Sequence, residues 1–252
     1  MSVNESSSAT IVTAAILVIG DEILSGRTKD KNIGYIAEYL TNIGVDLREV
    51  RVVPDVSEEI VAAVNALRGR YTYVFTTGGI GPTHDDITAD AVAAAFGVAI
   101  DHDPRAVAML SERFSPEELN EARMRMARIP AGAELVANAI SKAPGFNIGN
   151  VYVMAGVPAI MQAMLDVIGP TLQTGAKMLS DTVRAGLREG DIGGPLAEVA
   201  RAHPEVSIGS YPFWSETGPD TNIVVRSRDA EKLLAAMAAV KTMVAGEKQK
   251  SL

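Results

Sequence analysis

The sequence TTGGIGPTHDDIT, residues 76–88, follows the apolar run YTYVF and leads into a segment with helical periodicity. A glycine-rich connection between a buried strand and a helix lets the backbone approach a ligand closely. It also presents free N–H groups and the positive end of a helix dipole to an anion, at the edge where open α/β sheets bind ligands. The segment matches neither the P-loop pattern nor the dinucleotide pattern GxGxxG. It therefore predicts a phosphate-binding turn outside those two classes.

Strands and helices alternate on the N-terminal side of this loop. Residues 13–19 (TAAILVI) and 45–53 have the pattern of buried strands. Asp30 is placed to cap a helix that ends at Gly44, and Ser57 to cap the helix after the second strand. This alternation is typical of βαβ units with helices on both faces of a parallel sheet. The predicted fold class is α/β, a three-layer α/β/α domain with a mostly parallel sheet.

The alternation continues after the loop. Thr88 is placed to cap the next helix, and residues 104–128 have the composition of a long, charged helix. Residues 150–155 (NVYVMA) predict another buried strand, and Pro158 suits the first turn of the helix that follows. These elements extend the same sheet.

The pattern changes beyond residue 175. Two strands, at 206–212 and 222–228, are joined by a loop rather than a helix, which indicates an antiparallel pair in a small α+β unit. The other elements of this unit are a strand at 177–186 and helices at 192–202 and 229–245. We therefore expect a disordered tail (1–12), a large domain (13–174) and a small α+β domain (175–252).

Composition excludes several classes of function. The formal charge is −8, from 23 Lys and Arg against 31 Asp and Glu, and such an acidic balance argues against non-specific nucleic-acid binding. The sequence has no cysteine, so disulfides and thiolate metal sites are excluded. No apolar stretch is long enough for a membrane span, and the polar N-terminus does not have the pattern of a signal peptide. We expect a cytoplasmic protein.

The loop itself supplies the first candidate site residues, which have small or hydroxyl side chains. They are Thr77, Gly78, Gly79, Gly81, Pro82 and Thr83. Asp85 and Asp86 follow at once and would repel a phosphate unless a hard cation bridges them, because Mg²⁺ and Mn²⁺ take carboxylate and phosphate oxygens together. The alternative is that one aspartate supports the loop through its N–H groups and the other is solvated.

Other candidates lie at the ends of neighbouring strands. Asp21 and Glu22 follow the first strand through Gly20, and parallel strand ends converge on one crevice. Asn32 begins the next helix, where capping is the alternative role. Gly156, with Pro158 two residues later, would form one more wall of the pocket or a simple βα turn.

The remaining motifs predict structure rather than chemistry. APGF at 143–146 is expected to be a turn that could close the site. The three histidines have no metal-ligand spacing. Trp214, with Tyr211 and Phe213, is expected to pack inside the small domain.

The motifs GDEILSGRTKDKNIGYIAEYL (20–40), TTGGIGPTHDDIT (76–88), APGF and AGVP (155–158) together resemble the MoaB/Mog molybdopterin-binding domain family. More narrowly, residues 13–173 resemble the N-terminal domain of competence/damage-inducible protein A. The part that follows resembles the small KH-like domain found after it in that family. A C-terminal amidase domain, present in longer members, is not expected here. GDIGG at 190–194 also differs from a nucleic-acid-binding GXXG loop.

The resemblance implies a site for molybdopterin, as a phosphorylated pterin, or for an ADP-containing nucleotide. It also implies an alternative activity, hydrolysis of ADP-ribose or a related dinucleotide with Mg²⁺, Mn²⁺ or Co²⁺. In that case Asp85 or Asp86 would hold the metal, and Asp21 or Glu22 would orient or deprotonate water. Relatives of the fold commonly assemble, so a homo-oligomer is expected by analogy.

Overall fold

The computed structural model describes residues 11–216 and 218–250, and the chain divides into two compact units after Gly175. Residues 1–10 of the predicted tail lie outside the described residues. The predicted tail is wrong at its end, since Val12 is the first residue of strand β1 (Val12–Ile19) and is 4% exposed. Within the described ranges, no helix has both the length and the apolar character that crossing a membrane requires.

The first unit is built on a six-stranded sheet in the order β2-β1-β3-β8-β7-β6. Strands β2 (Val45–Val53), β1, β3 (Tyr73–Thr77) and β8 (Val151–Met154) are parallel. Strands β7 (Gly145–Ile148) and β6 (Glu134–Val136) extend the sheet in antiparallel pairing. The mostly parallel α/β sheet is confirmed.

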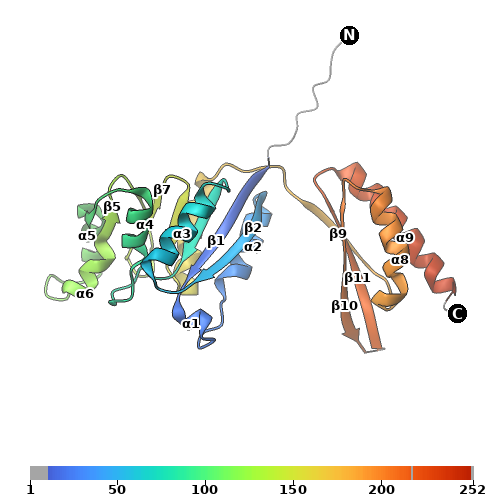
Figure 1. Cartoon of the computed structure of the whole chain (residues 1–252), viewed down its shortest axis with the longest axis horizontal. Coiled ribbons are helices and arrows are strands. Elements are labelled where there is room, and N and C mark those ends of the chain that lie inside the picture. The colour runs from blue at the N-terminus through green and yellow to red at the C-terminus, as the bar shows by residue number, and fades with distance from the viewer. Residues whose placement is uncertain (1–10, 217, 251–252) are drawn as a thin grey trace, which may run out of the picture. The chain divides into compact units, whose positions relative to one another are not determined.

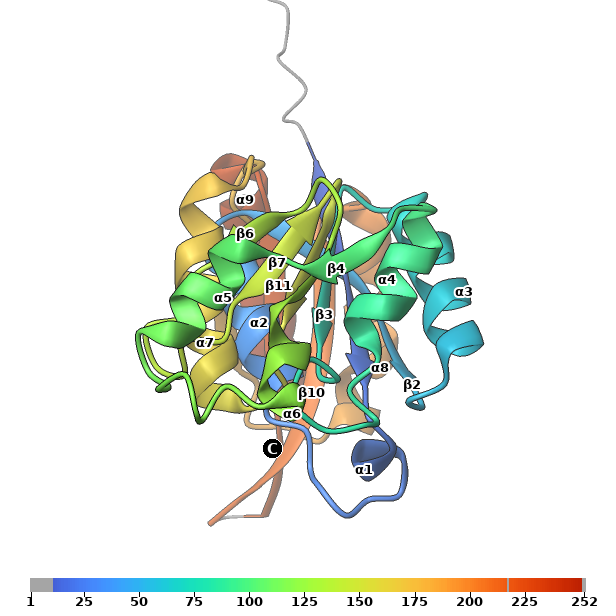
Figure 2. The same ribbon diagram turned by 90° about the vertical axis from the view of Figure 1, so that its left-hand side faces the viewer.

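Alternate residues of β1 explain the three layers. Ala15 and Leu17 pack with α3 (Ser57–Arg68) and α4 (Thr88–Phe96), whereas Ala14 and Ile16 pack with α2 (Asn32–Asn42) and α7 (Pro158–Ile168). Figure 2 shows α3 and α4 on one side of the sheet and α2 and α7 on the other. All four β1 side chains are fully buried, as expected for a parallel strand covered on both faces.

The order of the strands defines a crevice. The chain passes from β1 to its neighbour β2 on one side, and then crosses to β3 on the other side of β1. The direction of winding therefore reverses at the carboxyl ends of β1 and β3, which is where doubly wound sheets bind ligands. The short helix α1 (Asp21–Leu24) and the loop from Gly78 begin there (Figure 1).

The predicted helix starts are partly wrong. Asp30 Oδ1 does accept bonds from the N–H groups of Asn32 and Ile33, at 3.1 and 2.8 Å. Ser57 and Thr88, however, are the first residues of α3 and α4, and neither helix has a side-chain cap. A capping residue stands just before the first helical residue, and Val56 and Ile87 occupy that position here.

The long helix predicted at 104–128 is wrong. The structure has α5 (Pro104–Ser111), a turn, α6 (Glu121–Met124), a 3-10 turn (Arg125–Ala127) and then β5 (Arg128–Pro130), which pairs with β4 (Ile100–His102). Pro116 has no N–H and disfavours helical conformation in the residue before it, so the helix cannot continue. The predicted turn at 143–146 is also wrong in part, because Gly145 and Phe146 belong to β7.

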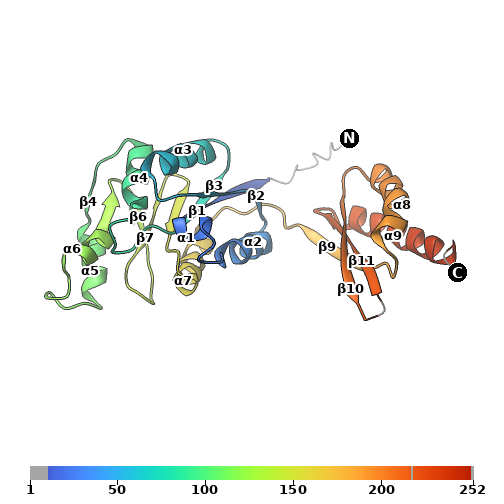
Figure 3. The ribbon, with the colours of Figure 1, turned by 60° about the horizontal axis from the view of Figure 1, so that its bottom comes forward.

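The second unit is a small α+β structure. Its antiparallel sheet has the order β10-β11-β9, from β9 (Leu179–Arg184), β10 (Ser207–Ser215) and β11 (Gly218–Ser227). Helices α8 (Glu189–Ala202) and α9 (Ala230–Lys250) cover one face (Figure 3) and share its core. The predicted packing of the aromatic residues is wrong for two of the three. Phe213 is half-buried, with the guanidinium carbon of Arg184 5.4 Å from its ring centroid, whereas Trp214 is 83% exposed and Tyr211 49% exposed. Trp214 and Tyr211 lie on β10, an edge strand of this sheet.

Candidate ligand-binding site

The loop after β3 requires glycine at two successive positions. Gly78 and Gly79 have φ values of 105° and 65°, in the region that disfavours side chains. A Cβ on Gly78 would lie 2.1 Å from the Ile19 carbonyl oxygen, and one on Gly79 would lie 2.2 Å from Thr88 Oγ1. The backbone of the loop therefore packs directly against the ends of β1 and α4, with no room for side chains between them.

Thr88 holds this loop in place. Its N–H donates to the Gly79 carbonyl at 3.0 Å, and its hydroxyl donates to the Gly78 carbonyl at 3.0 Å. The side chain is fully buried. What the sequence indicated as a helix cap is thus a tether between α4 and the loop.

The two loop aspartates have different surroundings. Asp86 Oδ2 accepts the Thr83 N–H at 2.8 Å and the Thr83 hydroxyl at 2.5 Å, so it supports the loop. Asp85 is exposed, and hydrogen bonding at Thr83 and the backbone, together with the nearby Arg125 guanidinium, holds its pKa below the ordinary value. In the described part of the chain, no group of three or more His, Asp or Glu residues is arranged to hold a metal.

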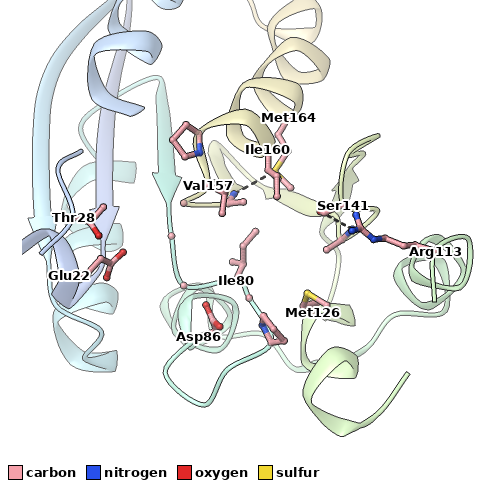
Figure 4. A pocket seen from close by; sticks show the side chains of 18 of the residues that line it. Glu22, Thr28, Ile80, Asp86, Arg113, Met126, Ser141, Val157, Ile160 and Met164 are labelled. Carbon is pink, nitrogen blue, oxygen red and sulfur yellow. Dashed lines mark hydrogen bonds between the residues drawn. The ribbon is translucent and has the colours of Figure 1, made fainter. Parts of the chain in front are cut away.

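A cleft of about 580 Å³, here called the main cleft, opens above the loop. Figure 4 shows Ile80 and Asp86 of the loop between Glu22 and Thr28 on one side and Met126 and Arg113 on the other. Its floor is the backbone of Gly78, Gly79 and Gly81 together with Pro82. Its walls are mainly apolar, formed by Phe114, Met126, Ala155, Val157, Pro158, Ile160 and Met164.

One wall of the main cleft comes from the segment whose secondary structure was predicted wrongly. Phe114 is half-buried, and the guanidinium carbon of Arg123 lies 4.5 Å from its ring centroid. Arg113 Nη1 donates to the Ile140 carbonyl at 2.7 Å, which ties this wall to the turn before β7. No motif marks these residues in the sequence, so only the tertiary structure assigns them to the cleft.

Acidic side chains gather near the ends of β1 and β2. Asp55 follows β2, and its Oδ2 accepts the Asp21 N–H at 2.9 Å. Burial raises the pKa of Asp55, with smaller contributions from the charges of Glu22, Asp21 and Asp85, while the bond from Asp21 opposes the shift. Asp55 was not predicted, although the reasoning that selected Asp21, an acid directly after a buried strand, applies to it equally.

A smaller cavity of about 220 Å³, here called the second compartment, adjoins the main cleft. Its lining combines apolar residues of β1 and α1 with polar ones, among them Lys29, Lys31, Asn32 and Thr77. Asn32 Nδ2 donates to the Gly156 carbonyl at 2.8 Å, which joins the start of α2 to the end of β8. The residues that border both cavities are Glu22, Thr28, Gly78, Gly156 and Pro158.

The structure brings most of the predicted site residues together. The predicted residues that line the main cleft are Glu22, Gly78, Gly79, Gly81, Pro82, Asp86, Gly156 and Pro158. Asn32 and Thr77 line the second compartment. Four predicted residues border neither cavity: Gly20, Asp21, Thr83 and Asp85.

Comparison with known proteins agrees with this architecture. Residues 15–174 match the family described as "Probable molybdopterin binding domain", and residues 177–251 match the family described as "FAD synthase, middle domain". A protein of Aeropyrum pernix is 35% identical over 216 residues, covering 81% of each chain. A "Probable FAD synthase" of Caenorhabditis briggsae is 30% identical over an alignment of 261 positions, and the alignment covers 93% of this chain and 50% of that relative.

A solved structure supports the same assignment. The crystal structure of "the protein CinA with unknown function" from Thermoplasma acidophilum matches with a TM-score of 0.61 and 32% identity. The match covers 64% of this chain and 98% of that chain. The resemblance to the MoaB/Mog family is thereby confirmed, and the chain belongs to the molybdopterin-binding domain family.

Proposed function

We propose that this chain binds a phosphorylated pterin of the molybdopterin class in the main cleft. One observation carries the proposal: a floor of glycine backbone faces apolar walls across a cavity of about 580 Å³. Small-molecule sites typically have volumes of about 300–1,000 Å³ and combine apolar walls with a few polar groups. The family assignment supports a ligand of this class.

The walls suit a flat ring. Phe114 and Met126 line the cleft, as do Ile160 and Met164, which lie on α7. Aromatic rings stack favourably on aromatic faces, and methionine sulfur and methyl groups adapt to ring surfaces. The glycine loop runs to the N-terminal end of α4, where the helix dipole favours the anionic part of the ligand.

A metal ion does not fit the residues as a preformed site. Asp86 already holds Thr83, so the aspartate pair leaves one carboxylate that does not support the loop. Mg²⁺ commonly binds through one or two carboxylates together with substrate phosphates and water. Any divalent cation here would therefore have to bind with its ligand, and we derive no reaction step through it.

The test is binding of molybdopterin, under anaerobic conditions, to the full chain and to two matched variants. Phe114→Leu removes an aromatic wall of the cleft and should weaken binding about tenfold, equivalent to about 1.4 kcal/mol. Phe96→Leu is the control, because Phe96 is also half-buried under an arginine, Arg68 at 4.1 Å, but does not line the cleft. The proposal fails if wild type does not bind, or if both variants bind as wild type does.

A second candidate function, hydrolysis of ADP-ribose or a related pyrophosphate, is favoured by Glu22. This carboxylate borders both cavities, so a pyrophosphate that spans them would lie beside it. Water would add to one phosphorus with its proton accepted by the carboxylate, the bond to the bridging oxygen would break, and AMP and ribose 5-phosphate would form.

Release of AMP from ADP-ribose, with Mg²⁺, Mn²⁺ or Co²⁺ present, tests this second candidate. Glu22→Gln should abolish turnover, while Glu38→Gln, on the exposed surface of α2, should leave it unchanged. Turnover that survives Glu22→Gln would exclude the proposed role of Glu22. No turnover by wild type, together with tight pterin binding, would leave binding as the function.

A further inference from the structure

We propose that the uncovered face of the β10-β11-β9 sheet, here called the open face, binds single-stranded nucleic acid. Helices α8 and α9 cover the other face of this sheet (Figure 3). The inference goes beyond the proposed function, because it concerns the second unit and a different class of ligand. Two aromatic rings held against the sheet, a row of unpartnered polar groups and the local charge carry it.

The strand register decides which side chains share the open face. Ile223 and Val225 of β11 are fully buried in the core that the helices cover, so the alternate residues of this strand point to the other side. The pairing of the strands extends this to their neighbours. The open face therefore carries the even-numbered residues of β9 and β11 and the odd-numbered residues of β10.

The first ring on this face, Tyr211, lies against the sheet. A Cβ on Gly209 would lie 3.1 Å from Cε2 of Tyr211, so the ring packs over a position that has almost no room for a side chain. Tyr211 is nevertheless 49% exposed, and its hydroxyl has no hydrogen-bond partner among the described residues. A ring that is fixed on one side and accessible on the other is a platform on which a base can stack.

The second ring, Phe213, is covered by an arginine whose orientation is fixed. The guanidinium carbon of Arg184 lies 5.4 Å from the centroid of the Phe213 ring, and Arg184 Nε donates to Oδ2 of Asp220. Asp220 is buried, whereas Arg184 is exposed. Because the described part of the chain offers its two terminal nitrogens no other hydrogen bond, the guanidinium can still donate to a phosphate or to a base edge.

Asn222 joins these groups into one row. It pairs in register with Tyr211 on one side and with Arg184 on the other, and within the described ranges its amide has no hydrogen-bond partner. Neighbouring strands lie about 4.8 Å apart, so the row spans about 10 Å. An amide both donates and accepts, as the edge of an unpaired base does. Sheets that bind single-stranded RNA stack two or three bases on aromatic side chains in this manner.

The charge of the open face favours an anionic ligand. Its charged side chains in the described ranges are Arg184, Arg226 and the buried Asp220, so none of the exposed ones is acidic. The acidic excess of the chain belongs to the large unit, because residues 176–252 contain ten Lys and Arg and ten Asp and Glu. An acidic peptide would also meet the arginines, but bases supply a flat group for each ring.

The test measures binding of fluorescein-labelled oligo(rU) and oligo(dT), about eight nucleotides long, to the full chain by fluorescence anisotropy. Binding of either probe supports the inference, and the tighter one identifies the sugar. Tyr211→Leu keeps an apolar side chain over Gly209 but removes the ring, and it should weaken binding about tenfold, the effect of one stacked base. Arg226→Gln, at an exposed position, should reduce the salt dependence of binding by about one phosphate contact.

Trp214→Leu is the matched control. Trp214 lies on the same strand and is more exposed than Tyr211, but it pairs with Pro219 and is an even-numbered residue of β10, so it is not on the open face. Its loss should leave binding unchanged. Phe114→Leu, in the main cleft, should also bind both probes as wild type does, and the backbone amide of Asn222 should shift in NMR spectra when a probe binds.

Four results would overturn the inference: no binding of either probe by wild type, undiminished binding by Tyr211→Leu and Arg226→Gln, an equal loss in Tyr211→Leu and Trp214→Leu, or equally tight binding of an oligoglutamate peptide. The last would make the open face a docking surface for acidic peptides. These failures are separable from failure of the proposed function, because molybdopterin binding and its loss in Phe114→Leu are measured in the main cleft.

Discussion

The two glycines Gly79 and Gly97 offer a direct measurement of how tightly the β3–α4 loop is packed. Their φ values are nearly the same, 65° and 66°, and they lie near opposite ends of α4. A Cβ on Gly97 would meet nothing within 4 Å, whereas one on Gly79 would lie 2.2 Å from Thr88 Oγ1. Alanine at either position therefore carries the same backbone strain, but only Gly79→Ala displaces the tether.

The expected magnitudes follow from these geometries. Gly97→Ala should lower the free energy of unfolding by about 1–2 kcal/mol, the cost of a left-handed conformation for an ordinary residue. Gly79→Ala should cost about 1–3 kcal/mol more, because Thr88 must rotate and leave the Gly78 carbonyl unsatisfied. In a Thr88→Ala background the 2.2 Å clash is absent and the contact with the Cβ of residue 88, at 3.2 Å, remains, so the cost of Gly79→Ala should fall close to that of the backbone strain.

Hydrogen exchange of β3 and α4 amides is the appropriate assay, because the chain has two compact units and a single unfolding transition cannot be assumed for both. Amides of α9, in the second unit, are the internal reference and should not change. The reasoning is refuted if Gly79→Ala costs no more than Gly97→Ala, or if its cost is the same with and without the Thr88 hydroxyl. Either result would mean that the loop can move away from α4 without loss.

Three further predictions concern acidic residues. Asp103 caps α5 through the Arg105 N–H, so Asp103→Ala should cost about 1 kcal/mol, measured by exchange in α5. The pKa of Asp103 is lowered, chiefly by its side-chain hydrogen bond with Arg105. The ionised carboxylate therefore adds to the free energy of unfolding above the ordinary aspartate pKa of about 3.9. Urea titrations should show this stabilisation being lost as pH falls below that value. The pKa of Asp55 is raised, mainly by burial. The folded state therefore favours the protonated carboxyl, and the resulting stabilisation is present at acid pH and is lost as pH rises through the folded-state pKa. Asp55→Asn should therefore unfold at higher urea concentration than wild type at pH 7 and at the same concentration near pH 3; lower stability at pH 7 would contradict this. Asp86→Asn should speed exchange of the Thr83 amide about tenfold, since a charged acceptor becomes a neutral one, and an unchanged rate would show that Asp86 does not hold the loop.

The elements with strong periodicity were predictable from the sequence. The apolar run at 13–19 is buried on both faces in β1, and the alternation of strands and helices gives the parallel part of the sheet. The short strands β4 to β7 were not predicted. They contain three or four residues each, too few for a pattern, and antiparallel pairing with one another or with β8 holds them in place.

The candidate site likewise contains some residues that the sequence predicts and others that it does not. The glycine loop has a local signature, because backbone with positive φ requires glycine wherever it occurs. Phe114 and Met126 have no such signature, since half-buried apolar residues are common and only the fold places these two in the lining of the main cleft. Asp55 is an intermediate case: its position after a strand was visible, but its contact with Asp21 depends on the pairing of β1 with β2.

The residues that border both cavities decide whether the site could hydrolyse its ligand as well as bind it. They are Glu22, Thr28, Gly78, Gly156 and Pro158, and a Cβ on Gly156 would lie 3.3 Å from Gly78 Cα. A ligand that crosses from one cavity to the other thus passes over backbone from the ends of two strands. Among these five residues only Glu22 has an ionisable side chain. A carrier and a hydrolase would hold the ligand with the same backbone, so the distinction between them depends on whether Glu22 has access to a water molecule beside the bridging oxygen.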